Sequence, residues 1–156
     1  DLLAWRGNRD NTASDWLIRT IGALTKSPYG HVGVAWRYGS DPHEVAVFEA
    51  TLPFIKLSPI AVSEEIDIVA MGMSHTWDKH HTHWLMSKVG KPYSLMDAFR
   101  AFVGKRLDED DDRWQCAEYC HWFYSDHGIA LSHDYTPGGL VHAALTYTNA
   151  NLCRLG

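Results

Sequence analysis

The segment between residues 31 and 50 constrains the fold most, because it predicts a β-hairpin at a fixed place in the chain. Residues 31–37 alternate valine and tryptophan with small side chains, and residues 45–50 are rich in valine and phenylalanine. Such segments are typical of strands. The sequence Tyr-Gly-Ser-Asp-Pro at 38–42 consists of turn-forming residues. The chain therefore contains at least one antiparallel pair of strands.

The predicted hairpin also brings two titratable side chains together. A turn centred on Ser40 pairs residues whose numbers sum to 80, so that His31 lies directly opposite Glu49. The side-chain stems of such a pair are about 4.5–5.5 Å apart, and a carboxylate there can accept the imidazole Nδ1 hydrogen. A slip of one residue would put the two groups on opposite faces. The alternative interpretation is an ordinary cross-strand polar pair.

Hydrophobic spacing and capping signals predict the remaining elements. Further strands are expected at residues 1–5 (as an edge or entry strand), 54–57 and 66–71. Helices are expected at 11–24, at 74–89 with Ser74 as its cap, at 95–103, at 115–127 with Gly128 as the left-handed residue that follows, and at 139–146. The chain is thus expected to form one α+β domain over residues 1–156, a small antiparallel sheet packed with helices.

Cys116 is the candidate nucleophile, because it stands at the start of the helix predicted at 115–127. A helix N-terminus lowers a thiol pKa through its dipole and free N–H groups, and a neighbouring imidazolium lowers it further. The same N–H groups can stabilise an oxyanion. Cys120 lies one turn further along and is expected to be buried. These two residues and Cys153 are too few for a disulfide framework and are expected to be free thiols, and a purely structural role for Cys116 is the alternative.

Short motifs follow one another along the chain. They are Tyr-Gly-His-Val-Gly-Val at 29–34, Phe-Glu-Ala at 48–50, Gly-Lys-Pro-Tyr at 90–93, Gln-Cys-Ala-Glu at 115–118, and Thr-Pro at 136–137 followed by Leu140. Together with the opening segment 1–7, they resemble the permuted NlpC/P60 papain-like proteins. That family includes the YiiX/YaeF-type cysteine hydrolases and is related to the lecithin:retinol acyltransferase group. The resemblance covers nearly the whole chain.

The resemblance implies a circularly permuted papain-like fold, in which the catalytic residues follow the order His, Glu, Cys. Carried over to this sequence, it makes Cys116 the nucleophile, His31 the base and Glu49 the residue that orients the base. It also implies substrate-binding positions for Tyr93, from the Gly-Lys-Pro-Tyr motif, and for Tyr29. The catalytic roles agree with the hairpin argument.

Two features depart from the family pattern. Ala117 stands where relatives often carry serine, and the acidic run at 108–112 has no counterpart. This run lacks the glycine and the ligand spacing of a calcium loop. It is expected to be a solvated loop, with attraction of a cationic substrate as the alternative.

Four histidines crowd the helix predicted at 74–89: His75, His80, His81 and His83. Neither a Cys-x-x-Cys nor a His-Glu-x-x-His zinc signature is present. A solvated helix face is therefore the expected interpretation, and no metal site is predicted.

Together, these observations predict that the protein is a cysteine hydrolase, which cleaves an amide bond through a thioester and needs no metal or organic cofactor. The resemblance suggests a peptide of bacterial cell-wall type, such as a peptidoglycan fragment, as the substrate. The alternatives are an acyltransferase or lipid-directed esterase, which an exposed apolar surface would favour, and a binding module without turnover. The net charge of -5 and the lack of a basic cluster argue against nucleic acid as a partner. No transmembrane segment or signal peptide is visible, and the localisation is left open.

Overall fold

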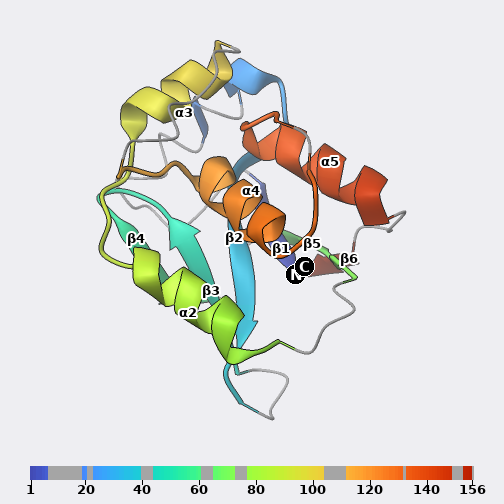
Figure 1. The fold of residues 1–156 in the computed structure, drawn as a ribbon. Helices are drawn as coiled ribbons and strands as arrows, with labels where there is room; N and C mark the ends of the chain where they lie inside the picture. The colour runs from blue at the N-terminus through green and yellow to red at the C-terminus, as the bar shows by residue number, and fades with distance from the viewer. Residues whose placement is uncertain are drawn as a thin grey trace.

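The computed structural model shows an α+β arrangement in which helices pack on one antiparallel sheet (Figure 1). The structure describes residues 1–6, 19–20, 23–39, 44–60, 65–72, 77–103, 112–131, 133–148 and 153–155. The expected α+β class is thus confirmed. Most of the helix predicted at 11–24, the cap Ser74, His75 and most of the acidic run at 108–112 lie outside the described residues.

The sheet has six strands in the described part of the chain, in the order β4-β3-β2-β1-β5-β6, and every neighbouring pair is antiparallel. The strands are β1 (Leu2–Arg6), β2 (Tyr29–Arg37), β3 (Val45–Ala50), β4 (Ile55–Pro59), β5 (Ile66–Val69) and β6 (Cys153–Leu155). The first five confirm the predicted strands with small shifts at their ends. The short β6 was not predicted from the sequence.

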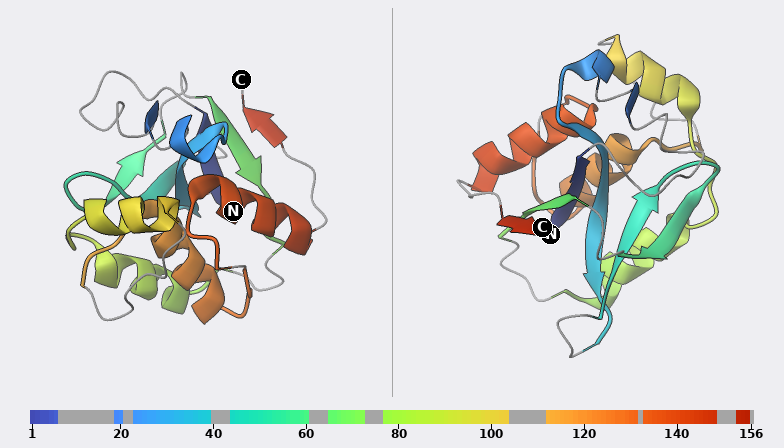
Figure 2. Two further views of the ribbon diagram at one scale, coloured as in Figure 1. Left: turned by 90° about the horizontal axis from the view of Figure 1, so that it is seen from above. Right: turned by 180° about the vertical axis from the view of Figure 1, so that it is seen from behind.

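Of the edge and entry positions expected for the first strand, the edge is wrong. β1 lies inside the sheet, between β2 and β5, as the view from behind shows (Figure 2). Its first four side chains, Leu2 to Trp5, are almost fully buried. A strand whose two faces are both covered has a continuous hydrophobic sequence. Such a sequence does not indicate whether the strand has one neighbouring strand or two.

The helices of the described ranges include α2 (Lys79–Lys88), α3 (Leu95–Phe102), α4 (Cys116–Asp126) and α5 (Pro137–Thr148). α4 packs on β2 and β3, and α5 packs on β1, β2 and β5. Both helices cross in front of the sheet in Figure 1, whereas α3 lies at the top of the molecule. The main core forms between sheet residues such as Val34 and Phe48 and helix residues such as Tyr119 and Leu140.

Capping explains where two of the helices begin and end. Asp78 caps α2, because its side chain accepts hydrogen bonds from the backbone of His80 and His81, so α2 begins later than predicted. α4 ends where Gly128 adopts a φ of +84°, which confirms the predicted left-handed residue. Within the described ranges, no helix is long and apolar enough to cross a membrane.

Candidate active site

The β2–β3 ladder has a different register from the one predicted. Val34 pairs with Phe48 and Arg37 pairs with Val45, so paired residue numbers sum to 82 rather than 80. The predicted turn was centred one residue too early, and the ladder shifts by two residues as a result. Because side chains alternate with a period of two, a shift of two residues keeps every side chain on its face. His31 and Glu49 therefore still share a face, now as diagonal neighbours.

The diagonal arrangement still gives a direct contact between the two side chains. His31 Nε2 lies 2.6 Å from Glu49 Oε2, and the two residues are 3% and 0% exposed. The prediction that Nδ1 would face the carboxylate is wrong. The other hydrogen-bonding partner of the ring is Cys116. Since Glu49 holds Nε2, Nδ1 is the ring nitrogen that remains for the thiol. One imidazole therefore connects a buried carboxylate with a thiol.

His31, Glu49 and Cys116 form a trio whose electrostatics favour a charged imidazole. Burial alone would lower the pKa of His31, but the hydrogen bonds to Cys116 and Glu49 outweigh burial and raise it from 6.5 to about 9. His31 is then an imidazolium at neutral pH. A cation hydrogen-bonded to both a carboxylate and a thiol is the arrangement that supports a thiolate nucleophile.

Cys116 is the first residue of α4, and a capping box holds this end of the helix. Gln115 Oε1 accepts from the Ala117 N–H at 2.9 Å, and Glu118 Oε2 accepts from the Gln115 N–H at 3.2 Å. In its protonated form, the Cys116 thiol donates to the same Gln115 Oε1, with Sγ and Oε1 3.7 Å apart. Gln115 Nε2 donates to the carbonyl oxygen of Tyr135 at 2.7 Å. The buried Gln115 side chain therefore ties Cys116 to the helix start and to the loop before α5.

The two tyrosines predicted to bind substrate lie in different surroundings. Tyr93 is buried beside Cys116. Burial is the largest cause that raises the pKa of its hydroxyl well above the usual value, and the neighbouring Cys116 and Glu118 raise the pKa further. The Tyr29 hydroxyl instead donates to Asp67 Oδ2 at 2.6 Å. The structure thus brings together Cys116, His31, Glu49 and Tyr93, and it directs the Tyr29 hydroxyl to a carboxylate on β5.

Three residues of this region were not predicted as part of the site. Trp5 pairs with His31 across β1 and β2, and its ring centroid lies 5.1 Å from the imidazole. Gln115 could have been found from the Gln-x-x-Glu spacing, which is a variant of the capping-box signature. Lys56 lies opposite Glu49 on β4, a pairing that no local signal in the sequence reveals.

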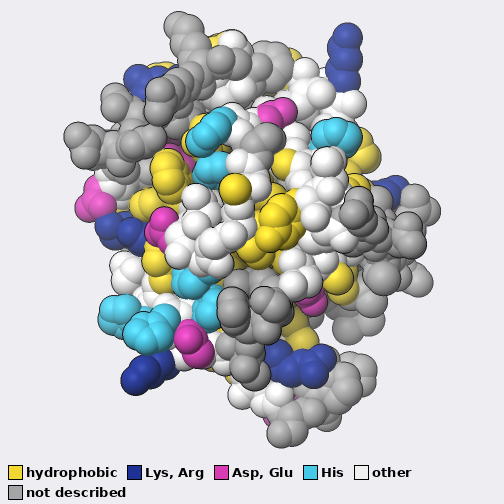
Figure 3. Space-filling view, turned by 45° about the vertical axis from the view of Figure 1, so that its right-hand side comes forward, with side chains coloured by type: hydrophobic (Ala, Val, Ile, Leu, Met, Phe, Trp, Pro, Cys, Tyr) yellow, Lys and Arg dark blue, Asp and Glu magenta, His cyan; other side chains and the backbone are white. Residues whose placement is uncertain are grey.

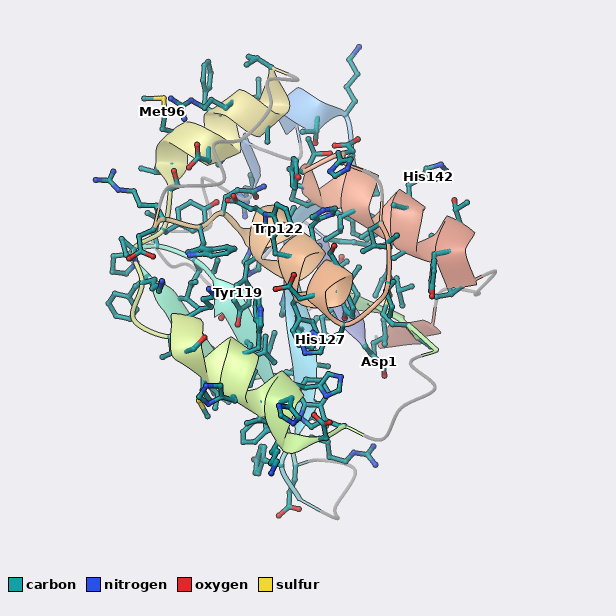
Figure 4. The ribbon with its side chains drawn as sticks, in the orientation of Figure 1. Asp1, Met96, Tyr119, Trp122, His127 and His142 are labelled. Carbon is teal, nitrogen blue, oxygen red and sulfur yellow. The ribbon has the colours of Figure 1, made fainter. Side chains whose placement is uncertain are left out.

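The predicted solvated histidine face is only partly correct. His80 and His83 are exposed, but His81 is 5% exposed and stacks on His127 with ring centroids 4.3 Å apart. Figure 4 shows His127 at the end of α4 that faces α2, and Figure 3 shows histidines gathered over this part of the surface. Tertiary packing between α2 and α4 buries His81. Among the described residues, no group of three or more His, Cys, Asp or Glu side chains could hold a metal ion.

No protein-family model matches the sequence, and no curated protein matches it. Five chains among the solved structures do match. One is the crystal structure of the metalloprotein YiiX from Escherichia coli O157:H7, with a TM-score of 0.51 and 18% sequence identity. The match covers 80% of this chain and 63% of that chain. At this identity the likeness shows the fold alone, which is a YiiX-like α+β fold.

Proposed function

We propose that this protein is a cysteine hydrolase on a permuted papain-like fold, with Cys116 as nucleophile, His31 as base and Glu49 as the residue that orients the base. The observation that supports this most strongly is the His31 ring. It is hydrogen-bonded to a buried carboxylate and to a thiol at a helix N-terminus. The substrate is an amide bond in a peptide of bacterial cell-wall type, a class that comes from the resemblance to NlpC/P60 proteins.

The first half of the reaction forms a thioester. The Cys116 thiolate attacks the carbonyl carbon, so that a C–S bond forms and the electron pair of the C=O bond moves to oxygen. Collapse of the tetrahedral intermediate restores the C=O bond and breaks the C–N bond. The His31 imidazolium donates its proton to the leaving nitrogen, which departs as an amine.

The second half releases the acid. Neutral His31 takes a proton from water, and the resulting hydroxide adds to the thioester carbon. The C–S bond then breaks, which regenerates the thiolate and the imidazolium. We assign stabilisation of the oxyanion to the Cys116 backbone N–H and the Tyr93 hydroxyl. The raised pKa of Tyr93 supports this assignment, because its hydroxyl keeps its proton and remains a donor.

Access to the nucleophile is restricted, since Cys116 is 1% exposed. The hydrogen bonds of Gln115 and the bulk of Tyr93 hold side chains close around Sγ. A substrate therefore reaches Cys116 only when these side chains move, so small reagents should react with this thiol faster than large ones.

To test the proposal, the wild-type protein is incubated with peptidoglycan fragments. Mass spectrometry then detects the new amine and the new carboxylic acid that cleavage of an amide bond produces. We expect Cys116→Ala and His31→Ala to abolish cleavage. Cys120→Ala is the matched control, because it removes a buried thiol from the same helix and should retain cleavage. Cleavage by Cys116→Ala at the wild-type rate would rule out the thioester mechanism.

A second candidate function is a lipid-directed esterase or acyltransferase that uses the same cysteine and histidine. Three apolar side chains of α3 are exposed to solvent: Leu95 is 48%, Met96 61% and Phe99 59% exposed. Figure 4 shows Met96 on the outer side of this helix. On the opposite side of α3, Asp97 is 2% exposed and Ala98 packs against the core. α3 also begins two residues after Tyr93, so the apolar surface is connected to the site.

Esters of different chain length separate the two candidates. If α3 binds acyl chains, p-nitrophenyl decanoate should be cleaved faster than the acetate, and Met96→Ser with Phe99→Ser should remove this preference. Met86→Ser on α2 is the matched control, because Met86 is also exposed, at 43%. Equal rates for both esters would favour the peptide substrate. If neither esters nor peptides are cleaved, the protein is a binding module.

A further inference from the structure

Three neighbouring strands carry a row of charged side chains that leads from the surface to the candidate site. Lys56 on β4 pairs directly with Glu49 on β3, and its Nζ lies 3.9 Å from Glu49 Oε1. The other carboxylate oxygen, Oε2, contacts His31 Nε2 on β2 at 2.6 Å. Each oxygen of Glu49 therefore faces a different cation.

The burial of these groups differs sharply. The Glu49 and His31 side chains are 0% and 4% exposed, whereas the Lys56 side chain is 43% exposed. A carboxylate removed from water loses several kcal/mol of hydration, and this loss must be offset by nearby positive charge. Lys56 can supply such charge while its own ammonium group stays hydrated.

Titratable groups from three packed elements face Glu49. His31 approaches from β2 and Lys56 from β4, and Cys120 interacts electrostatically from α4. Burial raises the pKa of the Cys120 thiol well above its usual value, so this thiol is neutral at pH 7. His31 and Lys56 are thus two cations that stabilise the ionised form of Glu49.

We propose that Lys56 is a positioning residue for this site: its charge keeps Glu49 ionised, and the ionised Glu49 holds His31 in its orientation toward Cys116. This role rests on the proposed function of the trio but needs no knowledge of the substrate. Because salt screens an exposed ammonium group, the influence of Lys56 on the ionisation of Glu49 should weaken as the salt concentration rises.

The direct test is a carbon-13 NMR titration of the Glu49 carboxyl group, assigned with Glu49→Gln. An opposite charge within about 4–6 Å lowers a carboxyl pKa by 1–3 units, and the exposure of Lys56 places the effect at the lower end. In Lys56→Met we expect the ionisation midpoint of Glu49 to rise by about one pH unit. Lys56→Arg should restore it, and Lys79→Met, which removes an exposed charge from α2, should leave it unchanged.

The rate of Cys116 alkylation supplies the functional readout. The acid limb of the pH–rate profile should move upward by about one unit in Lys56→Met. In the wild type, 1 M salt should produce part of the same shift. A Glu49 midpoint that is the same in Lys56→Met and the wild type overturns the role of Lys56. A shifted midpoint together with an unreactive Cys116 in the wild type contradicts the hydrolase proposal and leaves the influence of Lys56 on Glu49 established.

Discussion

His31 Nε2 lies 2.6 Å from Glu49 Oε2, although the two residues are not paired in the β2–β3 ladder. The contact is diagonal, and the length of both side chains allows it. It places the imidazole between a carboxylate and the first residue of α4. The ionisation of one buried side chain therefore affects the chemistry of another on a different element.

Replacing Glu49 by glutamine should weaken the reactivity of Cys116. The amide keeps the shape of the side chain but removes the negative charge that supports the imidazolium of His31. We expect the rate of iodoacetamide alkylation of Cys116 to fall about threefold at pH 8.5, because a His31 pKa about one unit below its wild-type value of about 9 leaves fewer imidazolium rings beside the thiol at that pH. Mass spectrometry of the modified peptide measures this rate. An unchanged rate would show that Glu49 has no electrostatic role at this site.

The stability of the protein should depend on pH through His31. The pKa of His31 is raised to about 9 in the folded state from 6.5. Its contribution to stability is therefore fully present below pH 6.5 and is lost as the pH rises through about 9. A difference of this size corresponds to about 3 kcal/mol. The free energy of unfolding in urea should fall between pH 6 and pH 9.5 in the wild type, and the fall should be smaller in His31→Gln.

The sequence predicts the elements whose signals are local. Alternation predicts β2, a segment rich in valine and phenylalanine predicts β3, and the turn residues between them indicate that they pair. The start of α4 and its end at Gly128 follow from helix periodicity and capping. These features need only neighbouring residues, so they could be located without knowing the packing.

Other features depend on contacts between distant segments. The interior position of β1 depends on its pairing with β5, and the burial of His81 depends on its stacking against His127. The register of the hairpin depends on the length of its turn, which turn-forming residues do not fix. The contact between Lys56 and Glu49 likewise requires the register of β3 and β4. The predicted hairpin still places His31 and Glu49 on one face, because a two-residue shift of the register preserves the face.

Gly33 should tolerate no side chain, because β1, β2 and β3 pack closely around it. An added Cβ would lie 2.5 Å from Val47 Cγ2 and 3.1 Å from the Phe48 carbonyl oxygen. Val47 is fully buried and β-branched, so its side chain cannot rotate away freely. We expect Gly33→Ala to lower the free energy of unfolding by about 1–3 kcal/mol.

A double mutant tests the cause of this destabilisation. Gly33→Ala combined with Val47→Ala should be more stable than the sum of the two single effects predicts, because the second change removes the clashing methyl groups. Strictly additive effects, measured by urea unfolding, would show that Val47 is not the source of the strain.

Gln115→Ala should reduce the stability of the protein and should also remove the hydrogen bond between Cys116 Sγ and Gln115 Oε1. The change removes the cap on the Ala117 N–H and leaves the Tyr135 carbonyl without its amide donor. Loss of a helix cap typically costs about 0.5–2 kcal/mol. Glu118→Ala is the matched control, because it breaks the other half of the capping box without touching Sγ. Both variants should lower the melting temperature, and Gln115→Ala alone should change the alkylation rate of Cys116.

Two changes at Tyr93 separate its bulk from its hydroxyl group. Tyr93→Ala opens space beside Cys116, which is 1% exposed, so the bulky disulfide reagent DTNB should react with this thiol more than tenfold faster than in the wild type. Tyr93→Phe keeps the ring and should leave the DTNB rate unchanged. Loss of one oxyanion donor typically costs a factor of about 10²–10³ in turnover, so Tyr93→Phe should slow substrate cleavage strongly while iodoacetamide alkylation continues. Cleavage by Tyr93→Phe at the wild-type rate would limit Tyr93 to covering the nucleophile, and the oxyanion would then have to be stabilised by the start of α4.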